Sequence, residues 1–257
     1  MKQILIVGCP RSGTTLLQAL LSSHKEIASI PETHFFPSLC SKFGLVRFLG
    51  LSTPSARSNL SFLSNKFLEK NIKPSFFSKK IINQFITFFD EYAKLCNCSA
   101  WLEKTPQNLW FLKFIKKYKK DFKIVHIERN PRDTIASIYD ACKKYPDSWG
   151  FKSIEEIVTL WKESKTLNDY WRNEPLHHFC KYEEICSNQD EEISKILDFL
   201  SIKSNEFTSH LNVADKLIEN SEVWKSGVNY SVSLAESKFR KVFTAPEQNL
   251  VDRLIKL

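Results

Sequence analysis

The first 21 residues carry the feature that most restricts how this chain can fold, an apolar run that stops at a glycine and resumes with a helical period. Residues 4–7 are expected to form a buried strand, residues 8–13 a tight loop, and residues 14–21 the first turns of a helix. Such a strand–loop–helix unit directs unpaired backbone N–H groups and the positive end of a helix dipole at whatever lies above the loop. We therefore expect it to bind an anion such as phosphate or sulfate.

The loop departs at one position from the pattern of nucleotide triphosphatases. Gly8, Gly13 and Thr15 match G-x-x-x-x-G-K-[ST], but Thr14 stands where the lysine is required. The fixed cation of the loop is Arg11 instead. A loop of this kind can hold a phosphate, but it lacks the usual contact with the γ-phosphate of ATP. This argues against an ATP-dependent kinase.

The length and net charge of the chain restrict the size of fold and the kinds of ligand that we expect. A chain of 257 residues is long enough for one large α/β domain with a proper core. The net charge of +8 favours anionic ligands. Lysines and arginines form no dense patch, so we do not expect nucleic acid as a partner.

The cysteines and the apolar runs indicate a compartment. The seven cysteines are scattered, and no set of Cys and His has the spacing of a zinc site, so free thiols are expected and no metal site. The first expected strand begins at residue 4, which leaves no room for a signal peptide, and no apolar run approaches about 18 residues. We therefore expect a soluble, cytoplasmic protein with no membrane partner.

Strands and helices alternate along much of the chain, which predicts a parallel sheet covered by helices on both faces. Residues 36–74 show no clear period and are interpreted as a mobile or irregular, partly helical insertion. The remaining strands are expected at 26–30, 99–102, 122–128 and 177–182, and the helices at 75–95, 106–118, 154–171, 191–200, near 246–255, and from Asn130, which can cap a helix opened by Pro131.

Polar residues follow three of the expected strands, where ligands bind in such sheets. Glu32 is a carboxylate that could take a proton from an attacking hydroxyl, and His34 is a rival base on the same side of an extended segment. Lys104 could neutralise growing negative charge. The structural alternatives are a surface carboxylate, a packed imidazole and an exposed lysine.

The third strand end carries a second set of phosphate-binding groups. Arg129 ends the strand and Ser137 follows two turns into the next helix. Arginine suits phosphate because its planar fork binds two oxygens at once. The alternative for Arg129 is an ion pair with Glu128 or Asp133.

Residues 10–17, Pro-Arg-Ser-Gly-Thr-Thr-Leu-Leu, resemble the 5′-phosphosulfate loop of sulfotransferases that use 3′-phosphoadenosine 5′-phosphosulfate (PAPS). The resemblance is closer to the tyrosylprotein-sulfotransferase-like and bacterial branch, with P-R-S-G-T-T, than to the cytosolic branch. It implies a P-loop-type three-layer α/β fold with a central parallel sheet, in a single domain over 1–257. It also implies sulfuryl transfer from PAPS to an acceptor hydroxyl or amine, with 3′-phosphoadenosine 5′-phosphate (PAP) as product.

The resemblance assigns residues to roles. Glu32 lies in a segment similar to P-E-x-x-F, whose glutamate is the base, although cytosolic members use a histidine, which leaves His34 open. Lys104 lies in an element similar to E-K-T-P and would act in catalysis together with Arg11. The cofactor would be held by Arg11, Ser12, Gly13, Thr14 and Thr15 at the phosphosulfate, by Arg129 and Ser137 at the 3′-phosphate, and by Tyr182 near the adenosine.

The chain also departs from the family. The C-terminal R-K-G phosphate loop of the cytosolic branch is absent, and residues 224–227 are the nearest match. Which residues complete the 3′-phosphate site therefore stays open. The acceptor could be a small molecule, a carbohydrate or a peptide, with residues 36–74 expected to form part of its pocket. Two alternative functions are a small-molecule kinase on the same fold and a nucleotide-binding protein without chemistry.

Overall fold

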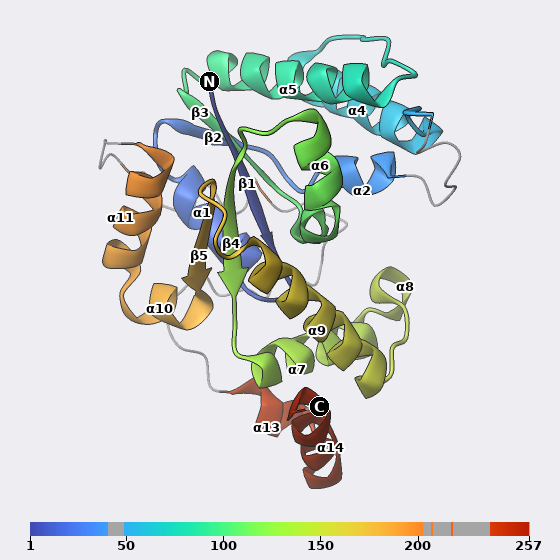
Figure 1. The fold of residues 1–257 in the computed structure, drawn as a ribbon, viewed down its shortest axis with the longest axis vertical. Helices are drawn as coiled ribbons and strands as arrows, with labels where there is room; N and C mark the ends of the chain where they lie inside the picture. The colour runs from blue at the N-terminus through green and yellow to red at the C-terminus, as the bar shows by residue number, and fades with distance from the viewer. Residues whose placement is uncertain (41–48, 203–206, 208–216, 218–236, 257) are drawn as a thin grey trace.

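The computed structural model describes residues 1–40, 49–202, 207, 217 and 237–256 and shows a parallel sheet between layers of helices (Figure 1). The strand order is β2-β3-β1-β4-β5, and all neighbouring strands are parallel. The predicted fold class is confirmed. The strands are β1 (Lys2–Gly8), β2 (Ile27–Ser29), β3 (Ala100–Lys104), β4 (Lys123–Glu128) and β5 (His177–Lys181).

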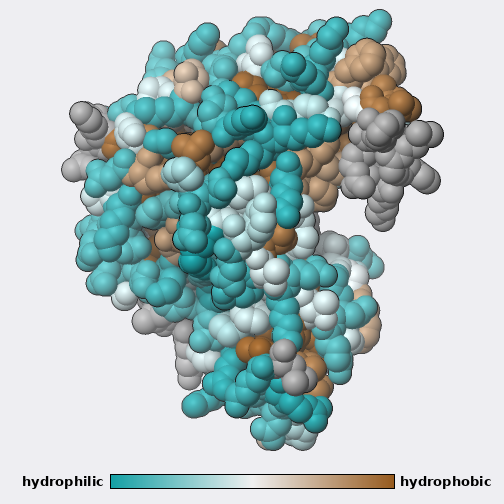
Figure 2. Space-filling view, viewed as in Figure 1, coloured by the Kyte–Doolittle hydropathy of each residue, from teal (hydrophilic) through white to brown (hydrophobic). Residues whose placement is uncertain are grey.

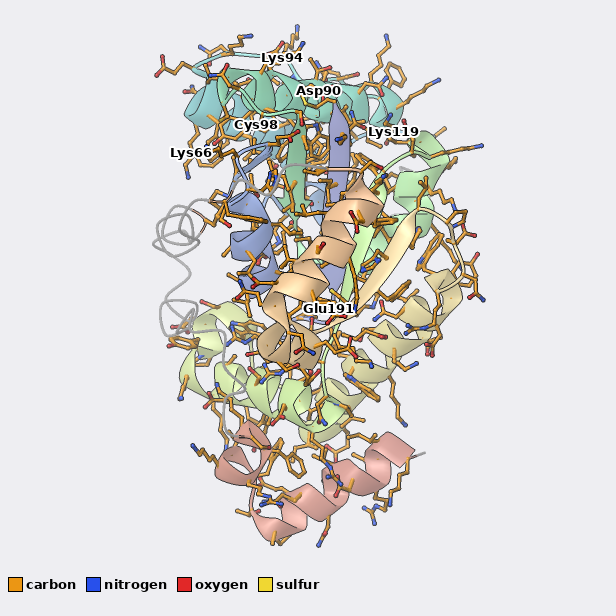
Figure 3. All side chains as sticks on the ribbon, turned by 90° about the vertical axis from the view of Figure 1, so that its left-hand side faces the viewer. Lys66, Asp90, Lys94, Cys98, Lys119 and Glu191 are labelled. Atoms are coloured by element: carbon orange, nitrogen blue, oxygen red, sulfur yellow. The ribbon has the colours of Figure 1, made fainter. Side chains whose placement is uncertain are left out.

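One face of the sheet is covered by α1 (Thr14–Ser22), α10 (Tyr182–Ser187) and α11 (Gln189–Leu200). In Figure 3, α11 lies in front of the strands, with Glu191 in its first turn. In β1, Ile4 and Ile6 pack toward this face, whereas Leu5 and Val7 pack toward the other. Because both faces are buried, the strand is a continuous apolar run in the sequence.

The other face is covered by an aromatic layer. Phe85 stacks on Phe35 with ring centroids 4.0 Å apart, and Phe89 stacks on Trp101 at 4.6 Å. Asp90, labelled in Figure 3, accepts a 2.7 Å hydrogen bond from the Trp101 indole. The helix expected at 75–95 is confirmed as part of this layer. Its elements are α2 (Phe35–Leu39), α4 (Pro54–Leu68), α5 (Ser78–Leu95), the 3₁₀ helix η1 (Pro106–Phe111) and α6 (Leu112–Tyr118).

The stretch 36–74 is more regular than its sequence indicated. It contributes most of α2 and all of α4, so the interpretation as irregular is wrong for 54–68, while its helical part is confirmed. Thr53 caps α4 by accepting a 3.1 Å hydrogen bond from the Ala56 N–H. Ala56, Leu60 and Leu63 are buried at helical spacing, but polar neighbours obscure that period in the sequence.

A third group of helices lies beyond the carboxyl ends of the strands, in the lower half of Figure 1. As predicted, Asn130 caps the first of them by accepting a 3.0 Å hydrogen bond from the Arg132 N–H. Residues 224–227 lie outside the described part of the chain. The group consists of α7 (Pro131–Lys144), α8 (Pro146–Trp149), α9 (Ile154–Trp171), α13 (Lys238–Val242) and α14 (Ala245–Lys256).

Several boundaries differ from the predicted ones. Strand β3 runs on to Lys104, and β5 ends at Lys181 because Tyr182 begins the short helix α10, which was not predicted. All seven cysteines fall in the described ranges and are free thiols, as expected. Within those ranges, no helix combines the length and apolarity needed to cross a membrane.

Two histidines in contact, the buried His126 and the partly buried His177, link β4 to β5 and α9. His126 is fully buried, with Nδ1 2.9 Å from Asn168 Oδ1 and Nε2 2.8 Å from His177 Nδ1. Burial lowers the pKa of His126 to about 3 and that of His177 to about 4. Both imidazoles are therefore neutral in the folded protein at pH values where an unfolded histidine is already protonated.

These histidines predict that the protein loses stability in mild acid. The free energy of unfolding should be nearly constant above about pH 7.5. Between about pH 6.5 and pH 4.5 it should fall by roughly 2 kcal/mol for His126 and by less for the partly exposed His177, because only the unfolded chain takes up the protons. Urea denaturation followed by tryptophan fluorescence measures the slope. His126→Gln should reduce it. An equal slope in wild type and His126→Gln would contradict the assignment.

Candidate active site

The carboxyl ends of β1, β3 and β4 open into a cavity of about 720 Å³. Figure 2 shows the surface hollowed at its right-hand edge, between the positions of α6 and α8. The lining residues come from six separate stretches of the sequence, 10–16, 32–34, 106–111, 129–138, 148–160 and 182. Eight of the predicted site residues line the cavity, namely Arg11, Gly13, Thr14, Thr15, Glu32, Arg129, Ser137 and Tyr182.

The loop that enters the cavity requires glycine at two positions. A Cβ at Gly13, where φ is 102°, would lie 2.4 Å from Cδ2 of Tyr182, and one at Gly8 would lie 2.7 Å from the Ile127 carbonyl oxygen. The loop is thus packed tightly against β4 and the start of α10. Helix α1 then begins without a side-chain cap and without an acidic residue in its first turn. Its first N–H groups are suited to hold an anion.

Arg11 connects this loop to α7. Its backbone is left-handed, with φ at 69°, and its Nε donates a 3.3 Å hydrogen bond to Ser137 Oγ. Its guanidinium carbon lies 6.0 Å from the centroid of the Trp149 ring. Burial, and then the neighbouring charge of Arg129, lower the pKa of Arg11. Two arginines held this close repel each other, which a bound anion would relieve.

Arg129 faces the same cavity from the end of β4. Its Nη1 donates a 3.3 Å hydrogen bond to the Arg11 carbonyl oxygen, and its guanidinium carbon lies 4.3 Å from the centroid of the Tyr182 ring. Its Nε is buried and has no hydrogen-bond partner within the described residues. A buried donor of this kind is costly unless something accepts from it. Arg129 therefore fits an anionic ligand.

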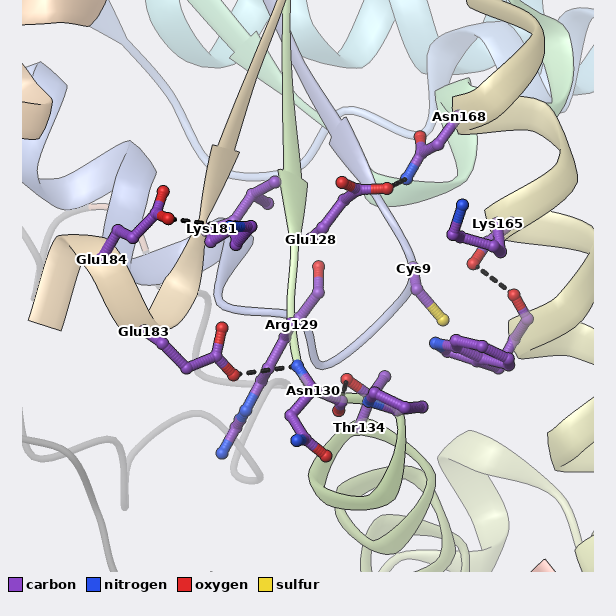
Figure 4. Close-up of a pocket in the computed structure, with 15 residues that line it drawn as sticks. Cys9, Glu128, Arg129, Asn130, Thr134, Lys165, Asn168, Lys181, Glu183 and Glu184 are labelled. Atoms are coloured by element: carbon purple, nitrogen blue, oxygen red, sulfur yellow. Dashed lines mark hydrogen bonds and ion pairs between the residues drawn. The ribbon is translucent and has the colours of Figure 1, made fainter. Parts of the chain in front are cut away.

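The structure rules out the ion pairs considered for Arg129. Glu128 pairs instead with Arg172, at 2.7 Å, and Asp133 accepts a hydrogen bond from Ser237. Figure 4 shows Glu128 directed toward Asn168 while the Arg129 side chain leaves β4 in the opposite direction.

Glu32, which lines the cavity, forms an ion pair with Lys104, which does not line it. The Lys104 side chain is fully buried, so the exposed-lysine alternative is wrong, and its Nζ also lies 3.4 Å from Thr15 Oγ1. Glu32 is 9% exposed, and its other carboxylate oxygen lies 3.4 Å from Nε2 of His34, which is 52% exposed. Glu32 is therefore neither a surface carboxylate nor isolated, and His34 is not packed in the core.

Ser12 is placed differently from the rest of the loop. Its hydroxyl is buried without a hydrogen-bond partner among the described residues, and it lines a second cavity of about 480 Å³ behind the loop. Figure 4 shows this second cavity, which Cys9 also lines. The expected contact between Ser12 and the cofactor stays a prediction.

Some residues that line the large cavity were not predicted. Gln107, Trp110 and Phe111 come from η1, and Trp149 and Lys152 from the connection between α7 and α9. The sequence carries one signal for the first group, the strand end at Lys104 followed by Pro106. Across the described ranges, no three His, Cys, Asp or Glu side chains are grouped so as to hold a metal ion.

Comparison with known proteins agrees with this geometry. The model of the Sulfotransferase family matches residues 3–206. The chain belongs to the sulfotransferase family. Family membership favours sulfuryl transfer over the kinase alternative.

Individual relatives are distant. A putative protein-tyrosine sulfotransferase of Caenorhabditis briggsae is 26% identical over 212 residues, covering 80% of this chain and 68% of the relative. A protein-tyrosine sulfotransferase of Drosophila melanogaster is 24% identical over 230 residues, covering 82% of this chain but 40% of the relative. A mouse sulfotransferase structure, complexed with PAP, shares the fold with a TM-score of 0.54 and 17% identity, over 98% of this chain and 82% of its own.

Proposed function

We propose that this protein transfers a sulfuryl group from PAPS to an acceptor hydroxyl, with Glu32 as the general base. The observation that carries the proposal is that Glu32, paired with the buried Lys104, lines one cavity together with two arginines and the loop at the start of α1. A protein that only bound a nucleotide would not need a carboxylate and a buried lysine beside the phosphate site. Membership of the sulfotransferase family supports the proposal.

The cavity residues fit a nucleotide with phosphate groups at two separate places. Arg11 and the start of α1 at Thr14 and Thr15 would hold the 5′-phosphosulfate. Arg129 and Ser137 would hold the 3′-phosphate, for which the unpartnered Nε of Arg129 is a free donor. Tyr182 would lie near the adenosine. The structural neighbour from mouse was determined with PAP.

The chain's own groups account for the chemistry. PAPS, when bound, supplies the sulfuryl group. The sulfur forms a bond to the acceptor oxygen, and its bond to the phosphate oxygen breaks. Glu32 takes the acceptor's hydroxyl proton onto its carboxylate. Lys104 and Arg11 keep two fixed positive charges beside the loop, where negative charge grows as the older bond breaks. Burial of Lys104 strengthens this effect, because water does not screen its charge.

A peptide tyrosine is the first acceptor to test, because two curated relatives are named protein-tyrosine sulfotransferases. Trp110, Phe111 and Trp149 give the cavity flat apolar surfaces that suit an aromatic ring, although small phenols and carbohydrates fit the same chemistry. None of the described residues in 36–74 lines this cavity. The expected contribution of residues 36–74 to acceptor binding stays a prediction.

The proposal is tested with radiolabelled PAPS and three acceptor pools: tyrosine-containing peptides, phenols and oligosaccharides. We expect label in at least one pool, and calorimetric binding of PAP that magnesium–ATP does not displace. PAP binding without transfer to any pool would favour a protein that binds the nucleotide but does no chemistry. Displacement of PAP by magnesium–ATP would favour a kinase. Either result would overturn the proposal.

The choice of base gives a matched pair of variants. Glu32→Gln should lower kcat by about 10²-fold and leave PAP affinity within about twofold, because an amide cannot take the proton but preserves the shape of the site. His34→Ala should lower kcat less than about tenfold, because its imidazole, 3.4 Å from the Glu32 carboxylate, would orient that base rather than take the proton itself. Steady-state kinetics at saturating PAPS measure both. The opposite order of losses would assign the base to His34.

A further inference from the structure

We infer that Glu103, on the buried side of β3, is a positioning residue that holds Glu32 in register with Lys104. The inference rests on the proposed role of Glu32 as the base. It concerns a side chain that does not line the cavity and that the sequence singled out only as the neighbour of Lys104.

Two residue pairs connect the segment after β2 with the end of β3, Glu32 with Lys104 and Thr33 with Glu103. The two pairs lie on opposite faces of β3. Successive side chains of a strand point to opposite faces, so Lys104 is directed at Glu32 and Thr15, whereas Glu103 is directed away from them. Thr33, the residue after Glu32, donates a 2.8 Å hydrogen bond to Glu103 Oε1. The pair on the cavity side thus has a counterpart on the buried side, one residue along each segment.

The Glu103 carboxylate is fully buried and accepts hydrogen bonds from three neutral donors. Its Oε1 accepts from the hydroxyls of Thr33 and Thr105, at 2.8 and 2.6 Å, and its Oε2 accepts from the Asn108 amide at 2.7 Å. Within the described residues, no cation lies within ion-pair distance of it. An ionised carboxylate accepts all three bonds at once, whereas a glutamine has a single acceptor oxygen.

The hydroxyls of Thr33 and Thr105 connect the Glu103 carboxylate to the backbone that follows Glu32. Thr33 Oγ1 accepts from the Phe35 N–H at 3.2 Å, and Thr105 Oγ1 accepts from the His34 N–H at 3.1 Å. His34 is left-handed, with φ at 49°, a conformation that costs energy for a residue with a side chain. The contacts around Glu103 therefore hold a strained turn in place next to the base.

Burial raises the pKa of Glu103, and the hydroxyls of Thr105 and Thr33 work against that rise. A buried carboxylate without a cation is a costly way to satisfy three donors if stability alone is at stake. The same carboxylate fixes two segments some 70 residues apart in sequence, as the positions of Thr33 and Glu103 show. We infer that the buried Glu103 carboxylate is kept, despite its energetic cost, because it fixes the direction of Glu32.

Variants of Thr33 separate positioning from simple stability. Thr33→Val keeps the shape but removes the hydroxyl, and Thr33→Ser keeps the hydroxyl. We expect Thr33→Val and Glu103→Gln to lower kcat about tenfold and to shift the acidic limb of its pH profile, with KM for PAPS unchanged. Thr33→Ser should restore kcat to within about threefold of wild type. Ser78→Ala, which removes a partly buried 3.0 Å bond to the Leu51 carbonyl, should lower only the melting temperature.

A readout that needs no acceptor completes the test. A crystal structure of Thr33→Val should show the Glu32–Lys104 pair broken or split between two rotamers. An intact pair with residues 32–35 unmoved would overturn the inference, whether or not the wild-type protein transfers sulfuryl groups. Unchanged kcat and pH profile in both variants would overturn it as well. Absence of transfer by the wild type would instead count against the proposed function.

Discussion

Replacement of Lys104 by methionine is expected to lower kcat about 10³-fold, with PAP affinity reduced less than about tenfold. Methionine fills nearly the same volume, so the change removes the charge rather than the packing. Lys104 is fully buried and lies between Glu32 and Thr15. Without its charge, nothing at that point balances the negative charge that grows on the departing phosphate oxygen, and the Glu32 carboxylate loses the cation with which it pairs. Steady-state kinetics and calorimetry with PAP measure the two effects.

The double variant makes this prediction sharper. If Glu32 and Lys104 act as a pair, Glu32→Gln combined with Lys104→Met should lose little more activity than Lys104→Met alone. Lys94→Met is the matched control, because Lys94 is exposed on α5, away from the cavity (Figure 3). Thermal melting shows whether each variant is folded. Losses that simply multiply, or full activity in Lys104→Met, would contradict the pairing.

The parts of the fold that the sequence predicted depend on neighbouring residues in the chain. The loop between β1 and α1 was predictable because Gly8 and Gly13 interrupt an apolar run within a few residues, and each glycine is required by a contact at that turn. The start of α7 was predictable because the Asn130 cap and Pro131 stand side by side. In the same way, continuous apolar runs indicated strands buried on both faces.

The parts that could not be predicted depend on contacts between distant segments. The burial of Lys104 is set by Glu32, 72 residues away, and nothing within β3 distinguishes it from an exposed lysine. The network around Glu103 depends on Thr33 in the same way. In α4, polar residues separate the buried Ala56, Leu60 and Leu63, so the period is visible only when α5 shows which side is covered.

The largest expected effect on binding concerns Arg129. We expect the wild-type protein to bind PAP about 10³-fold more tightly than adenosine 5′-phosphate, and Arg129→Met to reduce PAP affinity to nearly that of the monophosphate. A guanidinium that makes two charge-assisted hydrogen bonds to a phosphate accounts for this size of effect. Calorimetry of both nucleotides on both proteins gives the four affinities required. Arg129→Lys should fall between them, because it keeps the charge but not the planar fork.

Comparing the two nucleotides isolates recognition of the 3′-phosphate from the general attraction of a basic cavity. If Arg129 contacts that phosphate, Arg129→Met should change the affinity for adenosine 5′-phosphate less than about threefold, because this nucleotide has nothing at the ribose 3′ position. Arg172→Met removes a nearby guanidinium that is already paired with Glu128, and it should leave both affinities unchanged. Equal losses for both nucleotides in Arg129→Met would mean that Arg129 acts on the 5′ group or on the loop through its bond to the Arg11 carbonyl. If the wild-type protein bound PAP no more tightly than adenosine 5′-phosphate, there would be no reason to assign Arg129 and Ser137 to a 3′-phosphate. The cavity would then not distinguish PAP from ATP, which also lacks a phosphate at that position.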